Sequence, residues 1–448
     1  MTTHHSAPQA PTFWQAFTYW LKLGFISFGG PAGQIALMHE DLVERKRWIS
    51  EKRYLHALNY CMVLPGPEAQ QLATYIGWLM HRTWGGIVAG GLFVLPSLGI
   101  LIGLSWMYMA YGDVVAVAGV LYGIKPAVTA IVVSAAHRIG SRALKNGLLW
   151  GIAVAAFIAI FTFNLPFPLI VLAAGAAGYV GGRLAPDKFA VGGHGKGGNS
   201  AGPAVIDDDT PTPLHAVFTW RRFWQVLAVF LGIWLAAMGA LTLLSGRDAV
   251  LTQMAWFFTK AALMTFGGAY AVLPYVYQGA VEHFQWLTAM QMIDGLALGE
   301  TTPGPLIMVV SFVGFAGGWT KALFGPDALL LAGAVAATVV TFFTFLPSFL
   351  FIFLGGPFIE STHGKLKFTA PLTGITAAVV GVIVNLAVFF AYHVLWPRGL
   401  GGTFEWASAL IGLGAAVALL RFKVGVIPVV LTCGLAGLAL TLLRPLIN

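Results

Sequence analysis

The feature that most constrains this chain is a set of glycine- and proline-rich breaks that occurs twice at one spacing. Phe28-Gly29-Gly30 returns as Phe266-Gly267-Gly268, and Pro65-Gly66-Pro67 returns as Pro303-Gly304-Pro305, each 238 residues later. The same spacing relates Lys22 to Lys260, Ser27 to Thr265 and Trp48 to Trp286. A single register across such residues indicates that the chain is an internal duplication.

An unusually apolar composition places both repeats in a membrane. Hydrophobic residues make up 58% of the chain and charged residues only 9%, whereas a soluble domain carries roughly 25% charged residues. The sequence therefore predicts an all-α polytopic membrane protein. The two cysteines, Cys61 and Cys433, lie in different apolar segments, which argues against a disulfide framework or a cysteine metal site.

Composition divides the chain into five parts. The polar residues 1–12 predict a cytosolic tail, and the repeats occupy 13–185 and 247–448. Residues 186–221, rich in Gly, Pro, Asp and Ser, predict a flexible cytosolic linker. Residues 222–246 contain an unmatched apolar segment that is long enough to cross a hydrocarbon core of about 30 Å.

Loop charges predict that the two repeats have inverted topology. Residues 39–53 carry five Lys or Arg residues, whereas the matching residues 277–289 carry none. The bias reverses between residues 110–113, which have none, and residues 360–367, which have two. Because Lys and Arg favour the cytosolic side, equivalent loops lie on opposite faces. The single segment in 222–246 supplies the crossing that inverts the second repeat.

Each repeat is expected to combine two helical hairpins with four spanning helices. In the first repeat, the segments 13–38 and 54–81 contain the breaks and must each enter and leave on one face. Whether their arms cross fully or turn back midway stays open, because both give the same parity. The predicted spanning segments are 84–110, 114–137, 147–163 and 166–183, with counterparts at 327–354, 368–393, 404–420 and 425–443. Inverted repeats with paired breaks are typical of secondary transporters.

The breaks suit an anionic ligand. Pro31, Pro67 and Pro305 are expected to begin the second arm of a hairpin, because proline fits the first helical position. A helix start offers unpaired N–H groups and a partial positive charge, and glycines let a ligand approach the backbone. The candidate binding residues are Lys22, Ser27, Phe28, Gly29, Gly30, Pro31, Gln34, Pro65, Gly66, Pro67, Lys260, Thr265, Gly267, Gly268, Pro303, Gly304 and Pro305.

Two lysines supply the charge in this hypothesis. Lys22 and Lys260 each lie inside an apolar segment, six residues before a Phe-Gly-Gly element. Intramembrane lysines usually face a cavity or a partner, so the pair could form a dicationic site for a dianion. The alternative is snorkelling, since Lys22 lies early enough in its segment for the ammonium to reach an interface.

Three further charges are candidates for coupling or for the transport pathway: Glu68, Lys125 and Glu300. Each repeat has one acid near a break, and a titrating acid could couple transport to protons. Glu68 also has a simpler explanation, because a carboxylate at a helix start caps the helix. Lys125 lies deep in its segment, with no partner evident from the sequence.

The sequence contains few features that are typical of an enzyme. Nucleotide-binding motifs and metal-ligand spacings are missing, and the acids are isolated rather than clustered. We therefore expect no cofactor, no metal, no nucleic-acid partner and no enzymatic activity. The lipid bilayer is the expected surrounding, and a homodimer is left open.

The assembled motifs resemble the chromate ion transporter (CHR) family. The matching stretches are FTYWLKLGFISFGGPAGQIALM and DLVERKRWISEKRYLHALNYCMVLPGPEAQQLATYIGW in the first repeat, and FTKAALMTFGGAYAVLPYV and GLALGETTPGPLIMVVSFVGF in the second. The resemblance implies the long, two-domain form with antiparallel halves. It also implies chromate efflux and chromate resistance in bacteria, with sulfate as the structural analogue.

The first hypothesis is therefore a secondary transporter that exports chromate across the bacterial inner membrane, driven by the membrane potential and with proton coupling left open. The loop charges place the N-terminus in the cytosol and the C-terminus outside. The residues by themselves predict an anionic substrate, and only the resemblance implies that this anion is chromate. A transporter of sulfate or another oxyanion and a passive anion channel are the alternatives.

Overall fold

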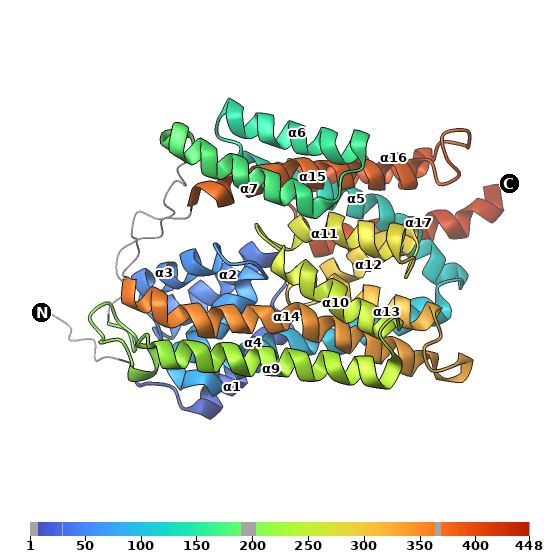
Figure 1. Ribbon diagram of the computed structural model, residues 1–448. Coiled ribbons are helices and arrows are strands. Elements are labelled where there is room, and N and C mark those ends of the chain that lie inside the picture. The colour runs from blue at the N-terminus through green and yellow to red at the C-terminus, as the bar shows by residue number, and fades with distance from the viewer. Residues whose placement is uncertain (1–7, 29, 190–202, 363–368, 448) are drawn as a thin grey trace, which may run out of the picture.

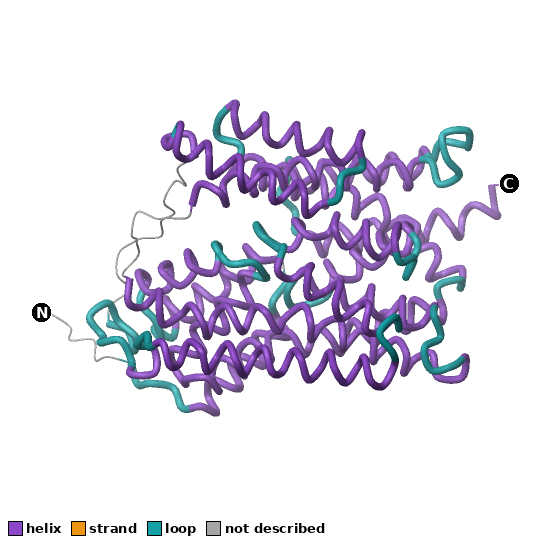
Figure 2. The backbone as a smooth tube through the Cα atoms, viewed as in Figure 1, coloured by secondary structure: helices purple, strands orange, loops and turns teal. Residues whose placement is uncertain are grey.

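A computed structural model describes residues 8–28, 30–189, 203–362 and 369–447 of the protein. Within these ranges the regular elements are helices, with one isolated bridge between Ile49 and Ile206 (Figure 2). Seven of the described helices are long and apolar enough to cross a membrane. The prediction of an all-α polytopic membrane protein is confirmed.

The helices follow the order that the duplication predicts. The first repeat contains α1 (Phe13–Ile26), α2 (Gly30–His39), the π-helix η1 (Glu40–Arg45), α3 (Glu51–Cys61), α4 (Glu68–Tyr111), α5 (Val115–Ala143), α6 (Gly147–Phe163) and α7 (Phe167–Leu184). The second contains α10 (Val250–Leu263), α11 (Ala269–Tyr277), the π-helix η3 (Gln278–His283), α12 (Ala289–Thr301), the 3-10 turn η4 (Leu306–Met308), α13 (Val309–Thr320), the 3-10 turn η5 (Pro326–Ala328), α14 (Leu329–Thr362), α15 (Thr369–Leu395), α16 (Trp406–Leu420) and α17 (Val426–Ile447). Between them lie α8 (Pro186–Phe189), the 3-10 turn η2 (Leu214–Ala216) and α9 (Trp220–Ser245).

Backbone irregularities recur at the same spacing as the sequence motifs. The π-helices η1 and η3 begin 238 residues apart, and each is followed by a residue with positive φ, Arg47 at 51° and Gln285 at 50°. Gly66 and Gly304 have φ of 125° and 100°. Since π-helices and left-handed residues are uncommon, their pairing supports the duplication in three dimensions.

The hairpin arms turn back within the membrane. The arms α1, α2 and α3 have 14, 10 and 11 residues, and even α1 is only about 21 Å long at 1.5 Å per residue. A core of about 30 Å is too thick for such arms to cross. In α4 the arm ends at a kink, because His81 and Arg82 have non-helical dihedrals, and the spanning part follows.

The helices form two bundles that lie one above the other in Figure 1. The hairpin bundle contains α1–α4 and α9–α14, and the six-helix bundle contains α5–α7 and α15–α17. Two glycine contacts of the same kind tighten the six-helix bundle. A Cβ on Gly123 would lie 1.9 Å from the carbonyl oxygen of Cys433, and one on Gly374 would lie 2.5 Å from that of Ala174. Close approach at small residues is how membrane helices pack.

The helix α9 runs the length of the hairpin bundle (Figure 1). We call the end at which α7 ends and α9 begins the linker end, and the opposite end, where α9 and α17 end, the far end. The second repeat therefore starts from the end opposite to the first, as inverted topology requires.

Part of the linker is docked rather than flexible. The Ile206 amide donates to the Trp48 carbonyl at 3.0 Å, and the Ser50 amide donates to the Ile206 carbonyl at 2.9 Å. Farther along, the ring of His215 lies 2.9 Å from the Trp78 carbonyl oxygen. The prediction of a flexible stretch over 187–213 is wrong for residues 203–213, because Ile206 is buried and because Asp208 and Thr210 accept hydrogen bonds from Ser50 and Arg53. Residues 190–202 lie outside the described ranges.

Candidate functional site

The four breaks meet inside the hairpin bundle, each against a break of the other repeat. The Gly304 amide donates to the Ser27 carbonyl at 2.8 Å, and the Gly66 amide donates to the Thr265 carbonyl at 2.8 Å. Ser27 aligns with Thr265 in the duplicated sequence, and Gly66 aligns with Gly304. The two hydrogen bonds are therefore the same contact, made once by each repeat. We call the region the crossing, and it comprises residues 27–34, 65–71, 265–268 and 303–305 with Ser97 and Ser348.

Two glutamine side chains hold the broken backbone of the crossing. The Gln34 amide donates to the Ser27 carbonyl at 3.1 Å and also to the Gly304 carbonyl. The Gln71 amide donates to the Pro65 carbonyl at 2.8 Å. These bonds satisfy carbonyl groups that a helix break would otherwise leave unpaired.

The central glycines of the two Pro-Gly-Pro elements have no room for a side chain. A Cβ on Gly66 would lie 2.6 Å from Ser348 Oγ, and one on Gly304 would lie 2.7 Å from Ser97 Cβ. Both glycines also have positive φ, which other residues adopt at a cost. The glycines thus bring each break against a serine of the long helix α4 or α14.

Unpartnered polar atoms gather at this point. Five side-chain oxygens have no hydrogen-bond partner among the described residues: Ser27 Oγ, Gln34 Oε1, Gln71 Oε1, Ser97 Oγ and Ser348 Oγ. Each of these side chains is at most 1% exposed. Ser27, Gln34 and Ser97 lie at the Gly304 contact, and Gln71 and Ser348 at the Gly66 contact. Leaving a buried polar group unsatisfied costs about 1–3 kcal/mol, so each contact is a candidate site for a polar ligand or water.

Helix starts give the crossing a positive potential without a charged side chain. The helices α2 and α11 begin at the Phe-Gly-Gly breaks, and α4 and η4–α13 begin directly after the Pro-Gly-Pro breaks. Pro67 and Pro305 occupy the N-cap positions. Unpaired N–H groups at such starts favour anions, and the nearby hydroxyl groups can donate to oxygen.

The two lysines are exposed, whereas the centre of the crossing is buried. Lys22 and Lys260 are exposed on the outside of the molecule, and Lys260 Nζ lies 5.8 Å from the ring centre of Trp256. Each lysine is five residues before Ser27 or Thr265, which turns the two side chains about 140° apart on a helix at 100° per residue. The dicationic pair therefore stays a prediction, and the buried crossing is described without it.

The other predicted residues are at or beside the breaks. Ser27, Gln34, Gly66, Pro67, Thr265, Pro303, Gly304 and Pro305 are buried, and Gly30, Pro31, Pro65, Gly267 and Gly268 are half-buried. Phe28 is 38% exposed and does not belong to the enclosed part of the crossing. Gly29 lies outside the described residues.

The two acids near the breaks have different surroundings. Glu300 is buried in α12 and accepts a hydrogen bond from the Tyr270 hydroxyl. Arg138 of α5 is close enough to Glu300 to act on it electrostatically. Glu68 is half-buried in the first turn of α4, where a carboxylate complements the helix dipole.

Lys125 has a partner that the sequence did not reveal. Its Nζ lies 3.5 Å from Asp294 Oδ2, and the Tyr108 hydroxyl donates to the same oxygen at 2.9 Å. Asp294 is only 2% exposed. Because Lys125 is on α5 and Asp294 on α12, the pair joins the six-helix bundle to the hairpin bundle.

Sequence reasoning missed Asp294, Ser97, Ser348 and Gln71. A signal for the serines exists in the sequence, since Leu95-Pro96-Ser97 returns as Leu346-Pro347-Ser348. The repeat marked these residues as matched, but only the fold shows that each serine lies against a Pro-Gly-Pro glycine of the other repeat.

Comparison with known proteins gives a consistent result. A sequence model described as "Chromate transporter" matches residues 14–179 and 252–438. The chain is 33% identical to the chromate transport protein of Pseudomonas aeruginosa over 447 residues, covering 97% of this chain and 94% of that protein. It is 31% identical to the chromate transport protein of Cupriavidus metallidurans over 421 residues, covering 94% and 90%.

A shorter relative matches only part of the chain. An uncharacterized transporter of Bacillus subtilis, YwrB, is 29% identical over 155 residues, which is 34% of this chain but 79% of that protein. A relative of about this size corresponds to one repeat. No solved structure matches the chain significantly.

Proposed function

The chain belongs to the chromate transporter family, and from that premise we propose that it is a secondary transporter that carries chromate out of the bacterial cytosol and so confers chromate resistance. The observation that carries the proposal is the crossing, where buried hydroxyl groups without partners among the described residues lie beside helix starts at each of two repeat-related contacts between breaks. A tetrahedral dianion fits such a site because it accepts hydrogen bonds in several directions and is attracted by helix N-termini.

Orientation and charge support outward transport in this proposal. We place the linker end in the cytosol, because the basic loop 39–53 lies there. The interior of a cell is negative, so a dianion moving outward is driven by about 4.6 kcal/mol per 100 mV for two charges. The membrane potential is therefore a sufficient source of energy for export.

Protons are a second source of energy in this proposal. Glu300 supports this role better than Glu68, because its carboxylate is buried and bonded to a tyrosine close to a break. If Glu300 exchanges a proton with each anion, Glu300→Gln removes the pH dependence of transport while chromate binding persists. A pH dependence that survives in Glu300→Gln would exclude this residue as the coupling site.

Everted membrane vesicles provide the main test. Vesicles that contain the protein should accumulate chromate when energised, and sulfate should compete if both dianions use the crossing. The matched control is a Ser97→Ala/Ser348→Ala protein that is inserted at the same level. Vesicles that take up no chromate and no sulfate would overturn the proposal, and currents far above transporter turnover would indicate a channel instead.

A further inference from the structure

The hairpins of the two repeats differ in what covers them. In α11 all nine residues are buried, whereas in the matching α2 only Gln34 and Met38 are. The cover on α11 comes from the six-helix bundle, through α15 and α7. The ring of Tyr277 lies 4.3 Å from that of Phe389 in α15, and the Phe167 amide at the start of α7 donates to Gln278 Oε1 at 3.1 Å.

The corresponding face of the first repeat is an open pocket at the linker end. Its volume is about 530 Å³, and all ten lining residues lie between Ala32 and Leu58, on α2, η1 and α3. Leu55 and Leu58 are only half-buried there, whereas their repeat partners Ile293 and Leu296 are 0% exposed. The pocket therefore lies where the second repeat has a helix packed against its hairpin, and no described helix fills that place in the first repeat.

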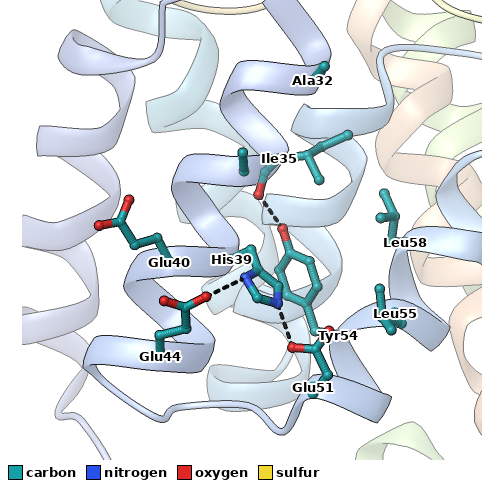
Figure 3. Close-up of a pocket in the computed structure, with 10 residues that line it drawn as sticks. Ala32, Ile35, His39, Glu40, Glu44, Glu51, Tyr54, Leu55 and Leu58 are labelled. Carbon is teal, nitrogen blue, oxygen red and sulfur yellow. Dashed lines mark hydrogen bonds and ion pairs between the residues drawn. The ribbon is translucent and has the colours of Figure 1, made fainter. Parts of the chain in front are cut away.

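The carboxylates in the pocket favour a positively charged group. His39 lies between two carboxylates, with Nδ1 at 3.3 Å from Glu44 and Nε2 at 2.5 Å from Glu51 (Figure 3). Glu40 lies on the outer side of the same group, and Leu55 and Leu58 line the opposite side. An occupant that combines an apolar helix surface with a positive charge would satisfy both parts.

The alignment of the two repeats predicts which residue would fill the pocket. The helices α5 and α15 align without a gap, so that Gly123 matches Gly374 and Arg138 matches Phe389, 251 residues apart. Phe389 is the residue that covers Tyr277, and Tyr277 is the repeat partner of His39. If the first repeat adopts the arrangement of the second, the residue that meets His39 is Arg138.

We propose that the pocket at His39, Glu44 and Glu51 is the docking surface for the basic end of α5, with Arg138 as its anchor, in a second conformation of this protein. In the described conformation Arg138 is exposed and lies near Glu300. The six-helix bundle is then held at the far end by Lys125 and Asp294.

Docking of Arg138 would close the linker end and release the far end. The arrangement suits alternating access between inverted repeats, in which each repeat adopts the shape of the other. Its use as a transport cycle rests on the proposed function, but the docking itself does not. Arginine fits here because its planar guanidinium can bind a carboxylate with two parallel hydrogen bonds.

Pairs of cysteines test the docking directly in the full chain in membranes. The background is Cys61→Ala/Cys433→Ala, because both native cysteines are free. His39→Cys with Arg138→Cys reports the proposed contact, and Tyr277→Cys with Phe389→Cys reports the contact already present. The matched control is His39→Cys with Val133→Cys, since Val133 is 40% exposed on another side of α5.

A short bifunctional thiol reagent should link residues 39 and 138 within one chain, and the control pair should stay unlinked. In a protein with all four cysteines, the two cross-links should exclude each other in any one molecule. This outcome supports the docking even if no chromate flux is detected, which separates it from failure of the proposed function. The inference is overturned if 277–389 links fully while 39–138 never does, or if the 39–138 link joins two chains.

Charge reversal tests Arg138 as the anchor without a cross-linker. Arg138→Glu would face Glu44 and Glu51 and should slow anion transport about 10-fold, because like charges oppose docking. Arg138→Lys should keep most of the rate, and adding Glu44→Lys to Arg138→Glu should restore part of it. A normal rate for Arg138→Glu would show that the arginine is not an anchor.

Discussion

The hairpins of the first and second repeats are alike at their breaks and different on their outer faces. At the breaks, the same amide-to-carbonyl bond of 2.8 Å is made twice. On the outer faces, His39 and Glu51 of the first repeat stand where the second has Tyr277 and Ala289. The crossing is thus built symmetrically, while the outer faces of the two hairpins are built from different chemistry.

This difference has a physical consequence. Two conformations related by the repeat would have equal energies if every contact were matched. An ion pair at one end and a mainly aromatic contact at the other respond differently to charge and to solvent. Substitutions in each region test whether the two hairpins share one function at the breaks and differ on their outer faces.

The largest effect is expected at the matched glycines of the crossing. Gly66→Ala and Gly304→Ala should each reduce chromate flux more than about 10-fold, because each places a Cβ within 2.7 Å of a serine at a positive φ. Vesicle flux at equal protein level measures both. Gly99→Ala in α4 is the matched control, because a Cβ there meets nothing within 4 Å.

If the crossing is symmetric, Gly66→Ala and Gly304→Ala should be similarly impaired. One severe and one silent substitution would show that only half of the crossing is used.

The next effect concerns the Lys125–Asp294 pair, whose repeat-related pair is not ionic. Asp294 matches His56, and Lys125 matches Thr376. Asp294→Asn should shift the balance of conformations about 10-fold, or about 1.4 kcal/mol, away from the described one. Labelling of a cysteine at Tyr277 from the far end should then increase, whereas His56→Ala should leave that labelling unchanged. Equal labelling in wild type and Asp294→Asn would contradict a locking role.

A smaller effect is expected from pH at the docked part of the linker. Burial lowers the pKa of His215 in the docked state, so docking is fully favoured above the free value of about 6.5 and weakens as the pH falls through that value. Amide exchange of Val205 and Ile206 should therefore speed up between about pH 7.5 and pH 5.5. His215→Gln should remove this change, and a wild-type protein with constant protection would refute the assignment.

The smallest effect is expected at the exposed lysines. Lys22→Gln and Lys260→Gln should each change chromate flux less than about twofold, because exposed charges far from a site act weakly through solvent. Flux assays with the same vesicles measure this. A loss comparable with that of Gly66→Ala would return the lysines to the binding site.

Most of the fold was predictable from the sequence. Hydrophobic length located the seven described helices that are long enough to span, whereas α6 and α16, which were also expected to span, are shorter apolar helices. Loop charge predicted the inversion. The fixed spacing of Phe-Gly-Gly and Pro-Gly-Pro located the hairpins. Hairpin depth was not predictable, because parity is the same for arms that cross and arms that turn back. The docking of the linker segment was not predicted, because its average composition is polar and does not reveal that Ile206 is buried.

The site was predictable only where the repeat pointed to it. Ser27, Gly66, Thr265 and Gly304 were identified from the motifs, and all lie at the crossing. The dicationic pair of lysines stays a prediction, although both side chains are exposed and each lies about 140° around its helix from Ser27 or Thr265. The contact between Lys125 and Asp294 spans the two repeats, and a single sequence contains no distance between them.

The central claim is that helix starts and serine hydroxyl groups, not lysines, hold the dianion. Equilibrium binding of chromate to the purified protein in lipid nanodiscs tests it most directly. Ser97→Ala/Ser348→Ala should weaken binding more than about 10-fold, because each hydrogen bond to a charged group contributes about 1.5–3 kcal/mol. Lys22→Gln/Lys260→Gln should bind nearly as wild type does. Unchanged affinity in the serine variant together with lost affinity in the lysine variant would contradict the account.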